Sequence, residues 1–121
     1  MTWTILLHEE FEGWLLEQAK RVRVAILAKA GVLGEYGPQL GRPLVDTVQG
    51  SRHKNMKELR IQVAGNPWRI LFAFDPERQA ILLVGGDKSG DKRWYEVHIP
   101  IADERFDAHL RSLENQSNPE G

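Results

Sequence analysis

Three strand-like segments separated by short turns constrain this chain more than any other feature of its sequence. Residues 57–64 alternate between polar and apolar side chains, residues 68–74 are strongly apolar, and residues 79–86 contain an almost continuous aliphatic run. The turns between them, residues 65–67 and 75–78, are rich in Gly, Asn, Asp and Pro. Short turns of this kind join neighbouring antiparallel strands. The sequence therefore predicts a three-stranded antiparallel meander at the centre of the fold.

The segments around the meander predict helices and one further strand. Residues 2–7 alternate with the period of a strand, whereas three other segments carry apolar residues at helical spacing. The helices are predicted at residues 9–18, 21–35 and 103–114, and a long loop is predicted over residues 36–56. The order β-α-α-β-β-β-α predicts an α+β fold, with two N-terminal helices packed on a small, twisted, mainly antiparallel sheet. We expect one domain over residues 1–114 and a disordered tail over residues 115–121.

The first hairpin of the meander places two arginines on one face. If Gly65 and Asn66 form a two-residue loop, the apolar residues of both strands face the N-terminal helices. Arg60 and Arg69 then emerge together on the opposite side, because side chains alternate along a strand. A slip by one residue would bury both guanidinium groups, which is costly. The sequence predicts a sheet with one core face and one open, basic face.

Charge and composition limit the classes of partner. The 121-residue chain carries a net charge of −1, and its basic residues gather in the middle, where residues 52–69 contain the acid Glu58. General adhesion to nucleic acid needs a larger positive excess, so we expect one small basic site. The chain contains no cysteine, and its start resembles no signal peptide. No apolar run approaches the ~20 residues of a membrane span. We expect a cytoplasmic protein without a membrane partner.

Four segments resemble the HigB-like, phage-related branch of the RelE/ParE toxin superfamily. They are residues 37–46, 50–60 and 67–75 around the hairpin, and the later stretch 85–95. The resemblance extends from the first strand to about Leu113. It implies the toxin of a type II toxin–antitoxin system with the RelE-like fold, an endoribonuclease that cleaves mRNA in the ribosome. It also implies a partner antitoxin with a helix-turn-helix domain, as in HigA.

The resemblance also implies which residues form the site. Arg69 matches the RelE-type arginine that follows the hairpin turn, and either Arg60 or Lys57 stands where RelE has strand lysines. Either Lys88 or Lys92 matches the basic residue after the last strand, and Tyr95 the nearby tyrosine. The expected catalytic residues are Arg69, Arg60, Lys57, Lys88 and Tyr95, and the expected RNA-binding residues are Lys54, Arg52, Lys92, Arg93 and Trp94.

Phosphoryl chemistry agrees with this set of residues. Arginine binds phosphate oxygens through a two-pronged, permanently charged group. The base for the RNA 2′-hydroxyl stays open between a lysine crowded by other cations and a histidine, with His53 and His98 available. Trp94 and Tyr95 could stack on a base. The acids show no metal-ligand spacing, so we expect a metal-independent site and no cofactor.

Other readings of the same residues stay open. Arg60 and Arg69 could be plain surface residues of a solvated sheet face, and Trp94 and Tyr95 could be packing anchors. His53 could be structural. At the level of function, a ParE-like protein would poison DNA gyrase by binding without catalysis, and a degenerate member would bind only another protein. The basic face with a tyrosine after the last strand favours the nuclease.

Overall fold

The structure, a computed structural model, describes residues 2–117. Its sheet has the strand order β1-β5-β4-β3-β2, in which β1 runs parallel to β5 and the other neighbours are antiparallel. The strands are β1 (Thr4–Leu7), β2 (Val45–Thr47), β3 (Met56–Val63), β4 (Asn66–Phe74) and β5 (Gln79–Asp87). The helices are α1 (Glu9–Leu16), α2 (Lys20–Tyr36), a short 3-10 helix (Gly37–Gln39) and α3 (Trp94–Ser117). The predicted α+β class and the β3-β4-β5 meander are confirmed.

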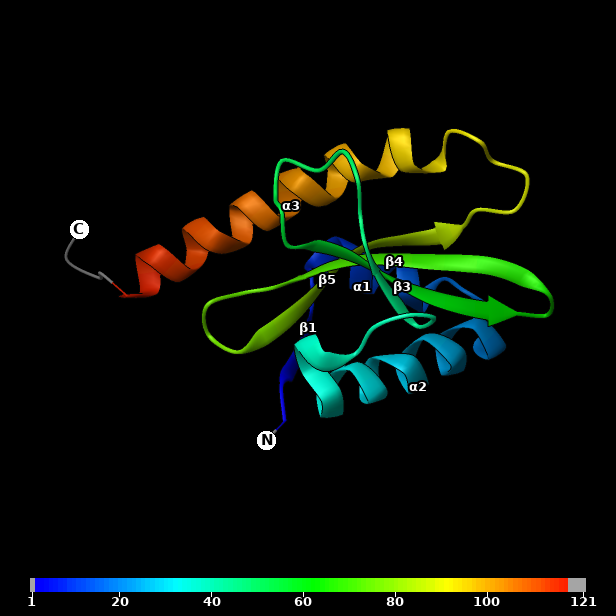
Figure 1. Cartoon of the computed structure of the whole chain (residues 1–121), viewed down its shortest axis with the longest axis horizontal. Coiled ribbons are helices and arrows are strands. Elements are labelled where there is room, and N and C mark those ends of the chain that lie inside the picture. Colours follow the sequence, from blue (N-terminus) through cyan, green and yellow to red (C-terminus); the bar gives the residue numbers. More distant parts are fainter. Residues whose placement is uncertain (1, 118–121) are drawn as a thin grey trace.

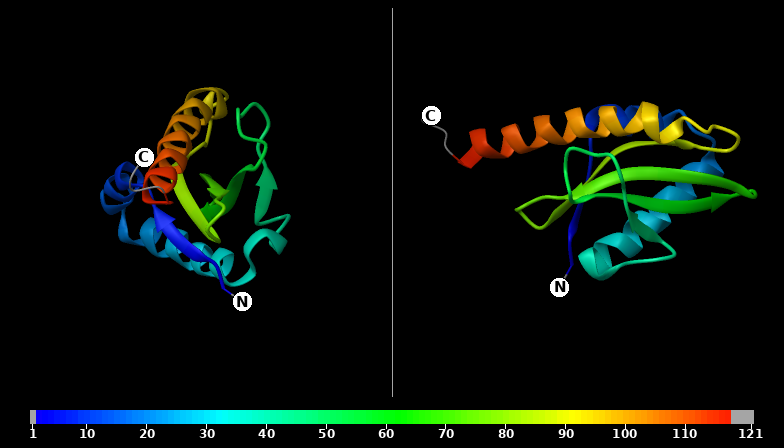
Figure 2. Two further views of the ribbon diagram at one scale, coloured as in Figure 1. Left: turned by 90° about the vertical axis from the view of Figure 1, so that its left-hand side faces the viewer. Right: turned by 45° about the horizontal axis from the view of Figure 1, so that its top comes forward.

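The elements form three layers, with the sheet in the middle (Figures 1 and 2). On one face, Phe11 of α1 and Ile26 and Leu33 of α2 pack against apolar side chains of β3, β4 and β5. On the other face, Trp94 and Phe106 of α3 pack against side chains that include Met56 and Leu71. Both faces of the sheet therefore contribute to a hydrophobic core. Among residues 2–117, the structure contains no helix of the length and apolarity that a membrane crossing requires.

The second core layer corrects the prediction of an open sheet face. Helix α3 begins at Trp94, nine residues before the predicted start at Asp103, and it continues to Ser117. Pro100 lies inside this helix, and proline is normally excluded from helix interiors because it lacks a backbone N–H. Because of this proline, the sequence predicts a helix that begins only after Pro100. The predicted tail is helical over residues 115–117, and its residues 118–121 lie outside the described residues.

The segment between α2 and β3 is less irregular than predicted. Residues 36–56 were expected to be a long loop, but they contain the short 3-10 helix and strand β2. Strand β2 pairs with residues 57–59 of β3 and forms one edge of the sheet. Three residues are too few to show the alternation from which a strand is recognised, so this edge strand could not be predicted.

The β3–β4 hairpin turns one residue earlier than predicted. Its two loop residues are Ala64 and Gly65, both with positive φ (51° and 83°), as the hairpin turn that matches strand twist requires. Asn66 already pairs with Val63. The pairing is thereby shifted by two residues from the prediction, and an even shift leaves every side chain on its predicted face. Arg60 consequently lies directly opposite Arg69.

Candidate active site

Arg60 and Arg69 form a cross-strand pair on the face of the sheet that α3 covers. They lie opposite each other on β3 and β4, and Gly86, the β5 neighbour of Arg69, lies against Trp94 of α3. The side chain of Arg60 is 38% exposed, and that of Arg69 is 7% exposed. The prediction that both arginines share one side of the sheet is confirmed. The expectation that Arg69 stands free in solvent is wrong, because α3 starts early and its first turn shelters this part of the sheet.

Glu58 supplies the carboxylate that faces both arginines. It lies two residues before Arg60, so its side chain leaves β3 on the same face. Its Oε2 atom is 3.4 Å from Nε of Arg60, and its Oε1 atom is 3.7 Å from Nε of Arg69. These are ion-pair distances without hydrogen-bond geometry, and neither buried Nε has a hydrogen-bond partner among residues 2–117. One carboxylate serves two guanidinium groups, so the pair keeps a net positive charge and unused donors.

Tyr95 and Lys88 complete the cluster. The Tyr95 hydroxyl donates a hydrogen bond to Oε1 of Glu58. Burial raises the pKa of Tyr95, and the adjacent Glu58 carboxylate raises it further while Arg69 opposes the shift. The phenol therefore stays protonated at neutral pH. The Nζ atom of Lys88 lies 5.7 Å from the centre of the Tyr95 ring. We call these residues the Glu58 cluster: Glu58, Arg60, Arg69, Lys88 and Tyr95.

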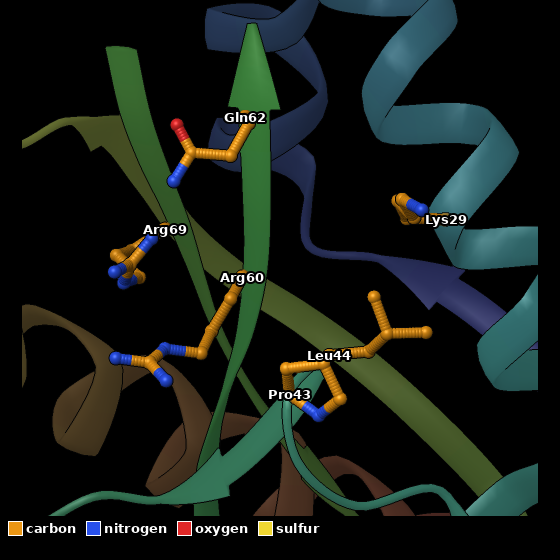
Figure 3. Close-up of a pocket in the computed structure, with 6 residues that line it drawn as sticks. All are labelled: Lys29, Pro43, Leu44, Arg60, Gln62 and Arg69. Atoms are coloured by element: carbon orange, nitrogen blue, oxygen red, sulfur yellow. The ribbon is translucent and has the colours of Figure 1, made fainter. Parts of the chain in front are cut away.

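Two pockets open beside the Glu58 cluster. The larger, of about 450 Å³, is lined by Arg60 and Arg69 together with Lys29 of α2, Pro43, Leu44 and Gln62. Figure 3 shows the two arginine side chains on one side of β3 and Lys29 on the other. The second pocket, of about 320 Å³, is lined by Glu58, Tyr95 and residues 47–49. The cluster is thus accessible from two sides, although Arg69 itself is buried.

The structure brings together four of the five predicted catalytic residues. Arg60, Arg69, Lys88 and Tyr95 belong to the Glu58 cluster, whereas Lys57 does not. Lys57 lies opposite Phe72, whose side chain belongs to the core under α1 and α2. Because alternate residues of a strand point to opposite faces, the assignment of Lys57 to this site is wrong. The sequence reasoning missed Glu58, whose signal was a lone acid two positions from Arg60 in a basic strand.

Among the predicted RNA-binding residues, Trp94 is the one whose predicted role the structure contradicts most clearly. Its side chain is 2% exposed and belongs to the core between α3 and the sheet. The ring stacks on His98 at 4.1 Å, and a Cβ atom added at Gly86 would lie 2.8 Å from its Nε1 atom. A ring enclosed in this way cannot stack on an RNA base. Trp94 is a packing anchor, the alternative that its sequence position left open.

The other predicted RNA-binding residues are exposed and scattered. Arg52 pairs with Asp107 of α3, and Arg93 pairs with Glu96 at 2.9 Å. Lys54 and Lys92 are exposed. None of these four residues lines either pocket of the Glu58 cluster. Their role in binding RNA stays a prediction.

The two candidate histidines make contacts that stabilise the fold. His53 Nε2 lies 2.7 Å from Oδ1 of Asp107, and the His53 ring packs edge-on against Phe106. Hydrogen bonds from His53 and Arg52 hold the pKa of Asp107 below its usual range. These contacts connect the loop that contains Arg52 and His53, which precedes β3, to helix α3 (Figure 1). His98 Nδ1 lies 2.7 Å from the Trp94 carbonyl. Neither histidine lines a pocket of the cluster, so the structure does not support them as the base.

Replacing Trp94 with alanine should destabilise the protein rather than affect a binding surface. Removing a buried indole costs about 3–5 kcal/mol of unfolding free energy, because the apolar contacts of the ring are lost and a cavity is left between α3 and the sheet. Urea denaturation measures this loss. The neighbouring exposed substitution Arg93→Ala is the control and should change stability by less than about 0.5 kcal/mol. A Trp94→Ala protein with unchanged stability would show that the ring is not part of the core.

The fold and the family are defined by comparison with known proteins. A mutant of the Escherichia coli toxin RelE in its free state superposes with a TM-score of 0.57 over 79% of this chain and 94% of that chain, at 13% identity. Archaeal RelE from a RelE–RelB complex of Pyrococcus horikoshii gives 0.54 over 74% and 99%, at 16% identity. At such low identity these likenesses define the fold alone. The chain has the RelE-like toxin fold.

Sequence similarity gives the family. A family model described as phage-derived protein, Gp49-like, matches residues 13–107. Two Mycobacterium tuberculosis proteins named as HigB toxins match over 109 residues each. HigB2 is 50% identical over 88% of this chain, and HigB3 is 49% identical over 89% of it. The chain spans about half of HigB2 (54%) and nearly all of HigB3 (94%). It belongs to the Gp49-like, HigB-type family, which confirms the resemblance read from the sequence.

Proposed function

We propose that this chain is the toxin of a type II toxin–antitoxin pair and that it cleaves mRNA on the ribosome. Membership of the HigB-type family supports the toxin role. One observation of the structure supports the nuclease role most strongly. Two cross-strand arginines share one carboxylate and line an open pocket of about 450 Å³. Guanidinium groups arranged in this way suit the oxygens of a phosphodiester.

In the proposed reaction, the RNA 2′-hydroxyl attacks the adjacent phosphate. The 2′-oxygen forms a bond to phosphorus as the bond to the 5′-oxygen breaks, leaving a 2′,3′-cyclic phosphate and a 5′-hydroxyl. Arg60 and Arg69 bind the non-bridging oxygens, whose charge grows in the transition state. Glu58 accepts the 2′-hydroxyl proton, and Lys88 gives a proton to the leaving oxygen. Tyr95 positions Glu58 through the hydrogen bond from its hydroxyl. We propose that the reaction needs no metal ion.

The choice of Glu58 as base follows from its surroundings. A general base must reach the proton that it removes, and Glu58 lines the 320 Å³ pocket together with Tyr95. The lysines and histidines considered from sequence are less suitable: Lys57 lies on the other face, and His53 and His98 are engaged elsewhere. Both arginines lie within ion-pair distance of this carboxylate, so a phosphate that they bind is held close to it.

The ribosome and the antitoxin are the proposed partners. With a net charge of −1, the chain offers little general attraction for RNA, so we propose that the ribosome holds and orients the strand. The reaction would then take place in the cytoplasm. A separate antitoxin would neutralise the toxin, and we propose that it carries a helix-turn-helix domain of the HigA type. RelE of Pyrococcus horikoshii, which shares the fold, was solved in complex with RelB.

The protein should cleave mRNA that is bound to ribosomes much faster than it cleaves free RNA. We expect the purified protein to cleave mRNA in the ribosomal decoding site at least about 100-fold faster than the same RNA alone, because positioning contributes heavily to this chemistry. The measurement is a time course of end-labelled RNA with and without ribosomes. Equal rates on both substrates would contradict the ribosome dependence. Cleavage of neither would contradict the nuclease assignment itself.

A further inference from the structure

The first turn of α3 carries Tyr95, whose hydroxyl donates a hydrogen bond to Glu58. The helix alone does not fix the place of this turn. Each N–H of an α-helix normally donates to the carbonyl four residues earlier, but Pro100 lies inside α3 and has no N–H. One hydrogen bond between the first turn and the rest of the helix, the bond to the Glu96 carbonyl, is therefore missing. Side-chain contacts must help to hold Tyr95 in place.

Trp94, the residue before Tyr95, makes these contacts. Its indole ring stacks on the His98 ring, with 4.1 Å between the ring centroids and 12° between the planes. The Tyr95 ring packs edge-on against the same indole, with the centroids 5.2 Å apart and the planes at 87°, an arrangement that aromatic pairs favour. The indole thus supports Tyr95 directly, besides filling the core between α3 and the sheet.

Gly86 of β5 provides the space that this indole occupies. A Cβ atom added at Gly86 would lie 2.8 Å from Nε1 of Trp94 and 3.5 Å from its Cε2 atom. The φ angle of Gly86 lies outside the left-handed region, so the backbone conformation does not require glycine here. A glycine inside a strand often marks a close approach, and here the approaching group is the indole. Gly86 is also the β5 partner of Arg69, so one position of β5 adjoins both Arg69 and the support of Tyr95.

We propose that Gly86 is a positioning residue of the candidate active site, which holds the Tyr95 hydroxyl on Glu58 by seating Trp94. Its effect on cleavage rests on the proposed function, whereas its effect on the place of Tyr95 does not. Burial and then the adjacent Glu58 raise the pKa of Tyr95, against the opposing effect of Arg69. Movement of the ring away from this environment would lower that pKa, so the pKa reports whether the hydroxyl is in place.

Gly85 is the matched control, because its missing side chain faces the other side of the sheet. A Cβ atom added at Gly85 would lie 2.5 Å from Cδ1 of Ile70 and 3.1 Å from two ring atoms of Trp14. Both of these residues belong to the core under α1 and α2. Gly85→Ala therefore introduces a comparable clash away from Tyr95. It should lower the stability of the protein but leave the pKa of Tyr95 unchanged.

Gly86→Ala should lower the pKa of Tyr95 toward its ordinary value. It should also slow cleavage of ribosome-bound mRNA about tenfold, as expected for the loss of about one hydrogen bond. The titration of Tyr95 is followed by NMR of the full chain with isotope-labelled tyrosine, and circular dichroism at each pH checks that the protein is folded. Tyr36, the second tyrosine of the chain, is exposed at the end of α2. Its titration should be the same in all variants.

Trp94→Phe tests whether the effect passes through the indole. A phenyl ring has no Nε1 atom, so Gly86→Ala should shift the pKa of Tyr95 less in this background than in the wild type. If Gly86→Ala does not fold, Trp94→Phe alone decides, because a smaller ring supports Tyr95 less and should lower its pKa as well.

An unchanged pKa of Tyr95 in Gly86→Ala would overturn the proposal and leave Gly86 a role in packing alone. So would an equal shift in Gly85→Ala, which would indicate a general loosening of the fold. In the absence of a folded Gly86→Ala, an unchanged pKa in Trp94→Phe has the same consequence. The titrations contain no RNA or ribosomes. A wild-type protein that fails to cleave mRNA would contradict the nuclease proposal and leave the result on Tyr95 as it stands.

Discussion

Replacing Arg69 with lysine is expected to slow mRNA cleavage on programmed ribosomes by about 100-fold while leaving the protein folded. Loss of one preorganised donor to a developing oxyanion typically has an effect of this size. Lysine keeps the positive charge beside Glu58, but its ammonium cannot bind two phosphate oxygens as a guanidinium does. The cleavage rate under single-turnover conditions and the urea denaturation midpoint together measure the two effects.

Comparing Arg69→Ala with Arg69→Lys distinguishes the loss of the positive charge from the loss of the guanidinium geometry. It leaves the buried Glu58 carboxylate with Arg60 as its remaining cationic partner in the Glu58 cluster. Breaking a buried ion pair costs about 3 kcal/mol or more, so this variant should lose stability as well as activity. On the open sheet face that the sequence predicts, alanine would leave folding unaffected, but Arg69 is only 6% exposed. A wild-type cleavage rate in Arg69→Lys would remove Arg69 from the reaction.

Glu58→Gln should slow the same cleavage by about 100-fold or more, the usual effect of losing a general base. Glutamine has nearly the same shape and can still accept the hydrogen bond from Tyr95, but it cannot take up a proton at neutral pH. A positioning role alone would leave the shape of the pH–rate profile unchanged. If Glu58 is the general base, we expect the pH–rate profile of the wild type to have an acidic limb that is absent from Glu58→Gln.

The control for Glu58→Gln is Glu77→Gln in the exposed turn between β4 and β5. It makes the same change of charge away from the Glu58 cluster, and its rate and pH profile should match those of the wild type. If Glu58→Gln cleaves at the wild-type rate, another group removes the 2′-hydroxyl proton. A slow variant that keeps the acidic limb would assign Glu58 a structural role in holding the two arginines.

The parts of the fold that sequence predicts well are those whose signal is local. The three strands of the meander and the two N-terminal helices follow from side-chain periodicity, and the shared face of Arg60 and Arg69 follows from parity along the strands. The start of α3 does not follow from local signals, because Pro100 contradicts a helix that tertiary packing of Trp94 and Phe106 nevertheless stabilises.

In the candidate site, too, the residues predicted from sequence differ from those that only the tertiary structure shows. Arg69 and Tyr95 were predicted through family resemblance, but their common neighbour Glu58 was not, since a contact between residues 58 and 95 depends on how α3 crosses the sheet. Lys57 looked equivalent to Arg60 because both are basic residues of one strand. They differ by an odd number of positions, however, which places them on opposite faces. Trp94 looked like a stacking platform until the helix that contains it was known.

The most direct test of the central claim is a primer-extension map of translated mRNA after brief induction of the protein in cells, with Arg69→Lys as the control. A ribosome-dependent nuclease that uses the Glu58 cluster should produce breaks at defined positions within codons, and these breaks should vanish in the variant. Intact mRNA together with double-strand breaks in DNA would contradict the account and point to gyrase poisoning instead.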